Sequence, residues 1–219
     1  MRVHPEMDEP ELRARIIATA RAMNAQGLNR GAAGNVSARS GGGFLITPTG
    51  MAYDELVPAD VVAMAADGSH RGARRPSSEW RLHRDLYAAR AEAGAIVHAH
   101  APFATALACL GREIPPFHYM IARFGGSTVR CAAYATFGTQ ELSDHALRAL
   151  EGRCACLLAN HGLLVFGRDL RHALDLAIEL ETLCEQYLRA AQLGQPRLLE
   201  EEEMRRVLEK FATYGQQAG

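Results

Sequence analysis

The chain has 219 residues, 48% hydrophobic and 22% charged, which is ordinary for a globular protein with a sizeable core. Its 24 basic residues nearly balance its 25 acidic ones, so no global positive field marks it for binding nucleic acid or an anionic membrane. No secretory leader, membrane-length apolar run, C-x-x-C pair, internal repeat or linker is found. We therefore expect a cytoplasmic protein with a single domain over residues 1–219, of which residues 1–8 form a flexible N-terminal tail.

The first predicted helix covers residues 9–26, where apolar residues recur at helical spacing. The segment after it, residues 27–37, contains three glycines within eight residues. Such a loop can bring backbone N–H groups close to an anion, but it can equally be a tight connection, which the residues alone favour. It is no dinucleotide fingerprint, because it follows a helix and precedes a strand.

A hairpin is predicted next, with strands at 35–39 and 44–47 joined by a glycine-rich turn. The second strand ends in Thr47-Pro48-Thr49-Gly50, a turn that carries hydroxyls and a flexible glycine. After a short strand near 57–64, Ser77-Ser78-Glu79 opens a helix that runs to about residue 93. Serines at a helix start usually cap it, although the first turn also offers unpaired N–H groups to an anion.

The segment Ile96-Val97-His98-Ala99-His100-Ala101-Pro102 reads as a strand with two histidines at positions i and i+2. Side chains alternate along a strand, so His98 and His100 face the same way, with Cα atoms roughly 6–7 Å apart. Two imidazoles at that distance can share one metal ion. The alternative is a pair of ordinary histidines that bond to the backbone, and this strand alone does not decide between them.

The rest of the chain alternates helices and strands. A buried strand that ends in Asn160-His161-Gly162 offers His161 as a third candidate ligand, and Gly162 is expected to permit the sharp turn that aims it. The remaining predictions are a helix at 103–110, an irregular segment at 114–126, strands at 129–135, 154–160 and 163–166, and helices at 139–150, 169–193 and 199–212.

Eight segments of the chain, in order, resemble the class II aldolase/adducin family. They are GLNRGAAGNVSAR, FLITPTGM, PSSEW, VHAHAP, IPPFHYMIA, YATFGTQELS, NHGLL and KFATYG. Together they extend from about Leu12 to Tyr214, and eight segments in register are far more specific than any one of them. The resemblance implies a three-layer α/β/α fold with a central, largely antiparallel sheet. It also implies a cyclic homotetramer with sites at subunit interfaces.

The resemblance further implies one divalent metal ion per subunit, usually Zn²⁺, bound by His98, His100 and His161. Glu79 matches the carboxylate near the metal, which is a possible fourth ligand and the acid/base once substrate is bound. Tyr119 matches the tyrosine that handles the proton on the aldehyde oxygen. The implied phosphate site consists of Gly34, Asn35, Thr49, Gly50, Ser77 and Ser78. The positions that shape the aldehyde end are Phe137 and Tyr214.

One position departs from the family pattern. A threonine that helps to hold phosphate is replaced here by Ala32. A hydrogen bond to a charged group contributes about 1.5–3 kcal/mol. We therefore expect weaker phosphate binding, a displaced phosphate or a shifted substrate, rather than an inactive protein.

The implied reaction is reversible cleavage of a ketose 1-phosphate, such as L-fuculose 1-phosphate. Its products are dihydroxyacetone phosphate and a small hydroxyaldehyde such as L-lactaldehyde. Cleavage leaves negative charge on an enediolate, which a metal ion with an open position can stabilise. A Schiff base is not expected, because Lys210 in the last helix is the only lysine.

Two alternatives stay open. An L-ribulose-5-phosphate 4-epimerase-like enzyme would use the same bond cleavage, but such enzymes typically carry Asp where this chain has Glu79. A metal-free interaction module like the adducin head would have no need of the three histidines and the glutamate.

Overall fold

The computed structural model describes residues 9–213; the expected tail at 1–8 and Tyr214 lie outside the described residues. Eight strands form one sheet in the order β4-β3-β2-β1-β5-β8-β7-β6. Every neighbouring pair is antiparallel except β6 and β7, which confirms the largely antiparallel sheet. The strands are β1 (Asn35–Ser40), β2 (Gly43–Ile46), β3 (Val62–Met64), β4 (His70–Arg71), β5 (Ala95–Ala99), β6 (Cys131–Ala132), β7 (Ala155–Leu158) and β8 (Gly162–Gly167).

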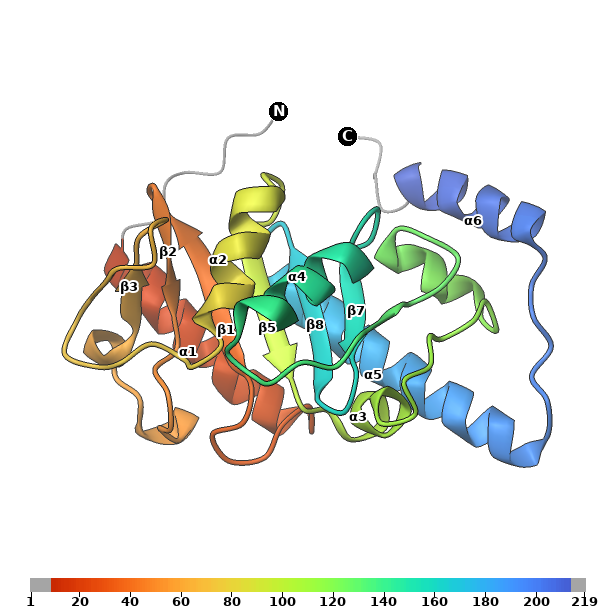
Figure 1. The fold of residues 1–219 in the computed structure, drawn as a ribbon, viewed down its shortest axis with the longest axis horizontal. Coiled ribbons are helices and arrows are strands. Elements are labelled where there is room, and N and C mark those ends of the chain that lie inside the picture. Colours follow the sequence, from red (N-terminus) through yellow and green to blue (C-terminus); the bar gives the residue numbers. More distant parts are fainter. Residues whose placement is uncertain (1–8, 214–219) are drawn as a thin grey trace.

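Helices cover both faces of this sheet, as Figure 1 shows. The α-helices are α1 (Glu9–Ala25), α2 (Trp80–Ala89), α3 (Pro102–Ala108), α4 (Gln140–Ala149), α5 (Leu170–Leu193) and α6 (Glu201–Thr213). Short 3₁₀ helices are η1 (Tyr53–Glu55), η2 (Pro58–Asp60) and η3 (Tyr119–Phe124). Successive side chains along a strand point into two different cores, one on each face of the sheet. Ile96 packs with α2 and α4, whereas Val97 packs with α1, α3 and α5. The predicted three-layer α/β/α fold is therefore confirmed.

The structure shortens several predicted elements. The strand expected at 129–135 is reduced to β6, because Val129 pairs only as an isolated bridge with Ile114. The helix expected from Ser77 begins at Trp80, with Glu79 at the N-cap position and no side-chain cap. The expectation that the serines cap this helix is thus wrong. Ser77 Oγ instead accepts a bond from the Glu79 backbone N–H (3.3 Å) and closes the turn before the helix.

The antiparallel order brings distant segments together at one end of the central strands. Asn35 at the start of β1 pairs with His98 near the end of β5, and His98 pairs on its other side with Leu164 of β8. The turn between β7 and β8 carries His161 to the same end of the strands, and α2 lies on the face that His98 occupies. No helix among residues 9–213 is both long and apolar enough to cross a membrane.

Candidate metal centre and substrate cavity

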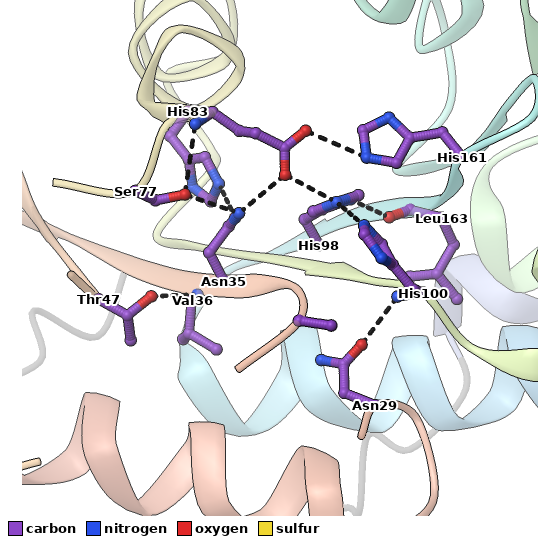
Figure 2. A network of polar contacts seen from close by, with 12 residues as sticks. Asn29, Asn35, Val36, Thr47, Ser77, His83, His98, His100, His161 and Leu163 are labelled. Atoms are coloured by element: carbon purple, nitrogen blue, oxygen red, sulfur yellow. Dashed lines mark hydrogen bonds and ion pairs between the residues drawn. The ribbon is translucent and has the colours of Figure 1, made fainter. Parts of the chain in front are cut away.

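The candidate ligands Glu79, His98, His100 and His161 converge at this end of the strands, with their ligand atoms all within 4.8 Å of one another. The Nε2 atoms of His98 and His100 are 3.1 Å apart. Glu79 joins the cluster through Oε2, 3.0 Å from His98 Nε2, and through Oε1, 3.2 Å from His161 Nε2. Figure 2 shows the imidazoles of His98, His100 and His161 turned toward one another, although they come from two separate parts of the chain.

Glu79 and His98 are buried, His161 is half-buried and His100 is exposed. Burial and close charges together move the pKa values of Glu79, His98 and His100. Burial raises the pKa of Glu79, but His98 and His161 outweigh it and hold that pKa well below its usual range. Burial likewise lowers the pKa of His98, but the Glu79 charge reverses the effect and leaves it raised. For His100, burial and the neighbouring histidines lower the pKa to about 4. The cluster thus presents an ionised carboxylate beside imidazoles, an arrangement that attracts a cation.

The donor set fits a divalent metal ion. His98 Nδ1 donates to the Leu163 carbonyl at 2.8 Å, which leaves the Nε2 lone pair directed at the centre. The side-chain oxygen of Asn29 accepts a bond from the His100 backbone N–H (2.8 Å) and so fixes the strand end. Glu79 Oε1 is buried and makes no hydrogen bond among the described residues, although it lies 3.2 Å from His161 Nε2, another candidate ligand atom. Three imidazole nitrogens and a carboxylate oxygen are typical ligands of Zn²⁺.

The turn that aims His161 differs from the expected one. Asn160 takes the left-handed conformation (φ 55°), the only non-glycine in the described residues to do so. Gly162 is needed for a different reason, because a Cβ there would lie 2.3 Å from the carbonyl oxygen of Ala99. Asn160 therefore makes the turn, and Gly162 allows β8 to approach β5 closely.

Gly34 connects the glycine loop to the metal cluster. It has a positive φ (73°), and a Cβ there would lie 2.4 Å from Asn29 Nδ2 and 2.5 Å from the His98 carbonyl oxygen. Two independent constraints therefore require a glycine here. One is the left-handed backbone, and the other is the close approach of Asn29 and of the His98 backbone, which belongs to the strand that carries the histidines.

We expect Gly34→Ala to lower the free energy of unfolding by about 2–5 kcal/mol. About 1–2 kcal/mol comes from the left-handed backbone and about 1–3 kcal/mol from overpacking against β5. Gly31→Ala is the matched control, because Gly31 has a similar φ (66°) with no heavy atom within 4 Å. Denaturant unfolding of both variants measures the difference, and equal losses would show that the close approach at Gly34 is unimportant.

A cavity of about 390 Å³ lies beside the cluster. The three loops flagged as possible anion sites all line it, through Gly34, Asn35, Thr49, Gly50, Ser77 and Ser78. Two of these loops are tied together, since the backbone N–H of Thr49 donates to the Arg75 carbonyl and that of Ser77 to the Thr47 carbonyl. Ala32 also lines the cavity, where it offers no hydroxyl.

The residues expected at the aldehyde end lie in different places. Phe137 lines the cavity and is 64% exposed. Its loop is held to α2 because Arg81 Nη1 donates to the Gly138 carbonyl at 2.9 Å. Tyr119, by contrast, is not among the described residues that line the cavity; it is 51% exposed in η3 and stacks on Phe211 of α6. One chain therefore does not bring Tyr119 to its own cluster.

Several residues of the site were not predicted from the sequence. Tyr134, Ala135 and Asn160 line the cavity, and Asn29 fixes the strand end that carries His100. His83 was also missed: its Nε2 lies 2.5 Å from Asn35 Oδ1, and its place four residues after Glu79, in the helix predicted from Ser77, could have indicated it.

The comparisons with known proteins agree with this geometry. The family model described as Class II Aldolase and Adducin N-terminal domain matches residues 14–188. The chain belongs to the class II aldolase/adducin family. It is an enzyme of the aldehyde-lyase class, a class II aldolase, as its curated relatives are.

Similar proteins carry more specific names. A 5-methylthioribulose-1-phosphate/5-deoxyribulose-1-phosphate aldolase of Rhodospirillum rubrum is 56% identical and covers 94% of each chain. An L-fuculose phosphate aldolase of Escherichia coli K12 is 47% identical over 95% of this chain and 98% of the relative. A solved L-fuculose 1-phosphate aldolase, 39% identical, superposes with a TM-score of 0.91 over 95% of this chain and 100% of its own.

Proposed function

We propose that the protein is a zinc-dependent aldolase that reversibly cleaves a ketose 1-phosphate between C3 and C4. The products are dihydroxyacetone phosphate and a small aldehyde. The observation that carries this proposal is the convergence of a three-histidine, one-glutamate cluster with three hydroxyl-bearing or glycine-containing loops on one cavity. The first set suits a metal ion and the second a phosphate. A ketose 1-phosphate needs both on one cavity.

On this proposal His98, His100 and His161 hold the metal ion, with Glu79 as a fourth ligand when no substrate is bound. A divalent ion there supplies Lewis-acid stabilisation of the negative charge that develops on the carbonyl oxygen, which contributes several kcal/mol. The only lysine, Lys210, is in α6 and does not line the cavity. No lysine there can form a Schiff base with the substrate carbonyl and take up this charge.

The phosphate end is assigned to the loops at Gly34, Thr49 and Ser77. Ser77 Oγ already accepts bonds from Asn35 Nδ2 at 3.0 Å and from the Glu79 backbone N–H. Its own hydroxyl hydrogen is therefore free to donate into the cavity, toward an anion. The positive end of the ten-residue helix α2 adds to this preference for negative charge.

Two residues carry the proton transfers on this proposal. Glu79 exchanges the proton at C3, the carbon that becomes the hydroxymethyl carbon of dihydroxyacetone phosphate. Tyr119 exchanges the proton on the C4 oxygen. Since Tyr119 does not line the cavity of its own chain, we propose that a neighbouring subunit supplies it, which requires a homo-oligomer such as the expected cytoplasmic homotetramer. Tyr214 keeps its proposed place at the aldehyde end.

For the substrate we propose a pentulose 1-phosphate that lacks the C5 hydroxyl. The names of the relatives at 56% and 42% identity, 5-methylthioribulose and 5-deoxyribulose 1-phosphate aldolases, support it. The aldehyde end of such a compound is apolar, and Ala135 and the ring of Phe137 offer apolar walls to it. L-Fuculose 1-phosphate, which ends in a methyl group, is the second candidate and is supported by the relatives at 47% identity.

The test is a panel of phosphate esters, with release of dihydroxyacetone phosphate as the readout. We expect 5-deoxyribulose 1-phosphate to be cleaved with a kcat/KM about tenfold above that of ribulose 1-phosphate, which differs only by the C5 hydroxyl. L-Fuculose 1-phosphate is the comparison that tests the second candidate. An epimer from L-ribulose 5-phosphate without any triose phosphate would instead establish the epimerase reaction and end the aldolase proposal.

A further inference from the structure

A buried chain of polar side chains extends from Glu79 away from the cavity. Asn35 Nδ2 lies 3.2 Å from Glu79 Oε2, and Asn35 Oδ1 lies 2.5 Å from His83 Nε2 (Figure 2). His83 Nδ1 is then 2.6 Å from Ser37 Oγ, which is 2.8 Å from the Tyr87 hydroxyl. Ser37, His83 and Tyr87 are buried and are not among the described residues that line the cavity.

The direction of the first bonds follows from Glu79. An ionised carboxylate only accepts hydrogen bonds, so the Asn35 group that faces Glu79 must be the amide NH₂. The same NH₂ also donates to Ser77 Oγ. The Asn35 carbonyl oxygen therefore faces His83, whose Nε2 has to carry a hydrogen and donate to it.

The remaining bonds follow from His83. Burial, with a smaller contribution from His98, lowers its pKa to about 3, so its imidazole is neutral. With the hydrogen on Nε2, Nδ1 can only accept, and the Ser37 hydroxyl donates to it. The single Ser37 hydrogen is then used, so Ser37 Oγ accepts from the Tyr87 hydroxyl. Each group in the chain has one possible role.

We propose that His83, as the neutral Nε2–H tautomer, is a positioning residue that fixes the Asn35 amide and thereby holds the Glu79 carboxylate against the histidine cluster. A flipped Asn35 would turn its carbonyl oxygen toward the carboxylate and repel it. An amide does not pass a proton on at neutral pH, so the chain orients Glu79 and does not conduct protons to it. The consequence for turnover rests on the proposed function.

Three variants test the inference in the full-length protein. His83→Leu removes the donor to Asn35, whereas His83→Gln places an amide N–H where Nε2 was and restores it. Phe44→Leu is the packing control, because the Phe44 ring stacks on His83 with centroids 6.5 Å apart and makes no hydrogen bond there. The readouts are zinc affinity by competition with a chromophoric chelator, kcat and KM separately, and the imidazole ¹⁵N spectrum, with His83 assigned by its loss in His83→Gln.

We expect the His83 resonances of the wild-type protein to show a hydrogen on Nε2 and none on Nδ1. His83→Leu should weaken zinc binding about tenfold or more and lower kcat with little change in KM. His83→Gln should recover most of both, and Phe44→Leu should leave both near the wild-type values. An Nδ1–H tautomer, or equal losses in His83→Leu and Phe44→Leu, would overturn the inference. If the wild-type protein cleaves no ketose 1-phosphate, the proposed function fails, while zinc affinity and the tautomer still decide this point.

Discussion

Replacing His161 with alanine is expected to remove bound metal and aldolase activity together. On the proposed ligand set this side chain supplies one of three nitrogen ligands, and no described histidine other than His98 and His100 shares the cluster with it. Loss of an outer partner of a ligand typically costs 10–100-fold in metal affinity, so loss of the ligand itself should cost about a hundredfold or more. Without the ion, several kcal/mol of charge stabilisation disappear, which corresponds to a rate at least about a thousandfold lower. Elemental analysis and cleavage assays measure the two losses.

His70→Ala is the control, because His70 is an exposed histidine in β4, at the far edge of the sheet. It should keep both metal and activity. Circular dichroism should show that His161→Ala is folded, since the imidazole sits at a turn and not in either core. A His161→Ala protein that binds zinc as the wild type does would remove His161 from the ligand set.

The parts of the site that lie within a strand could be predicted from the sequence. His98 and His100 fall on one side because side chains alternate along an extended chain, and no tertiary information is needed for that. The large helices were predictable for a similar reason, since α1 and α5 have apolar residues at a spacing that only a helix brings to one face. The spacing of apolar residues in a helix and the alternation of side chains along a strand are local properties, so a single sequence contains them.

Contacts between segments could not be predicted in the same way. Nothing local indicates that Asn29 fixes the backbone of His100, or that Asn160 and not Gly162 makes the turn before β8. The place of Tyr119 is a further case: its motif associates it with the reaction, yet the chain folds it against α6. Whether a residue serves its own subunit depends on how copies pack, and the chain's own periodicity does not encode this.

Glu79→Gln is expected to separate metal binding from proton transfer. The three imidazoles remain, so the variant should still hold its ion at saturating zinc, with an affinity lowered at least as much as in His83→Leu. Its amide can neither take nor give the proton at C3, and general acid–base catalysis typically contributes 10²–10⁴-fold. We expect kcat for cleavage to fall by about that factor. A more direct readout is deuterium exchange: with dihydroxyacetone phosphate alone in D₂O, the wild-type protein should label the hydroxymethyl carbon, and Glu79→Gln should not.

Tyr119→Phe is the matched control for that exchange experiment. On the proposed roles it lacks the proton for the C4 oxygen, which is absent when dihydroxyacetone phosphate is the only ligand. It should therefore lose cleavage but keep deuterium labelling, whereas Glu79→Gln should lose both. Because Tyr119 lies in η3, apart from the cluster, its replacement should also leave zinc content unchanged. Full exchange in Glu79→Gln, or lost exchange in Tyr119→Phe, would show that the two proton transfers are assigned to the wrong residues.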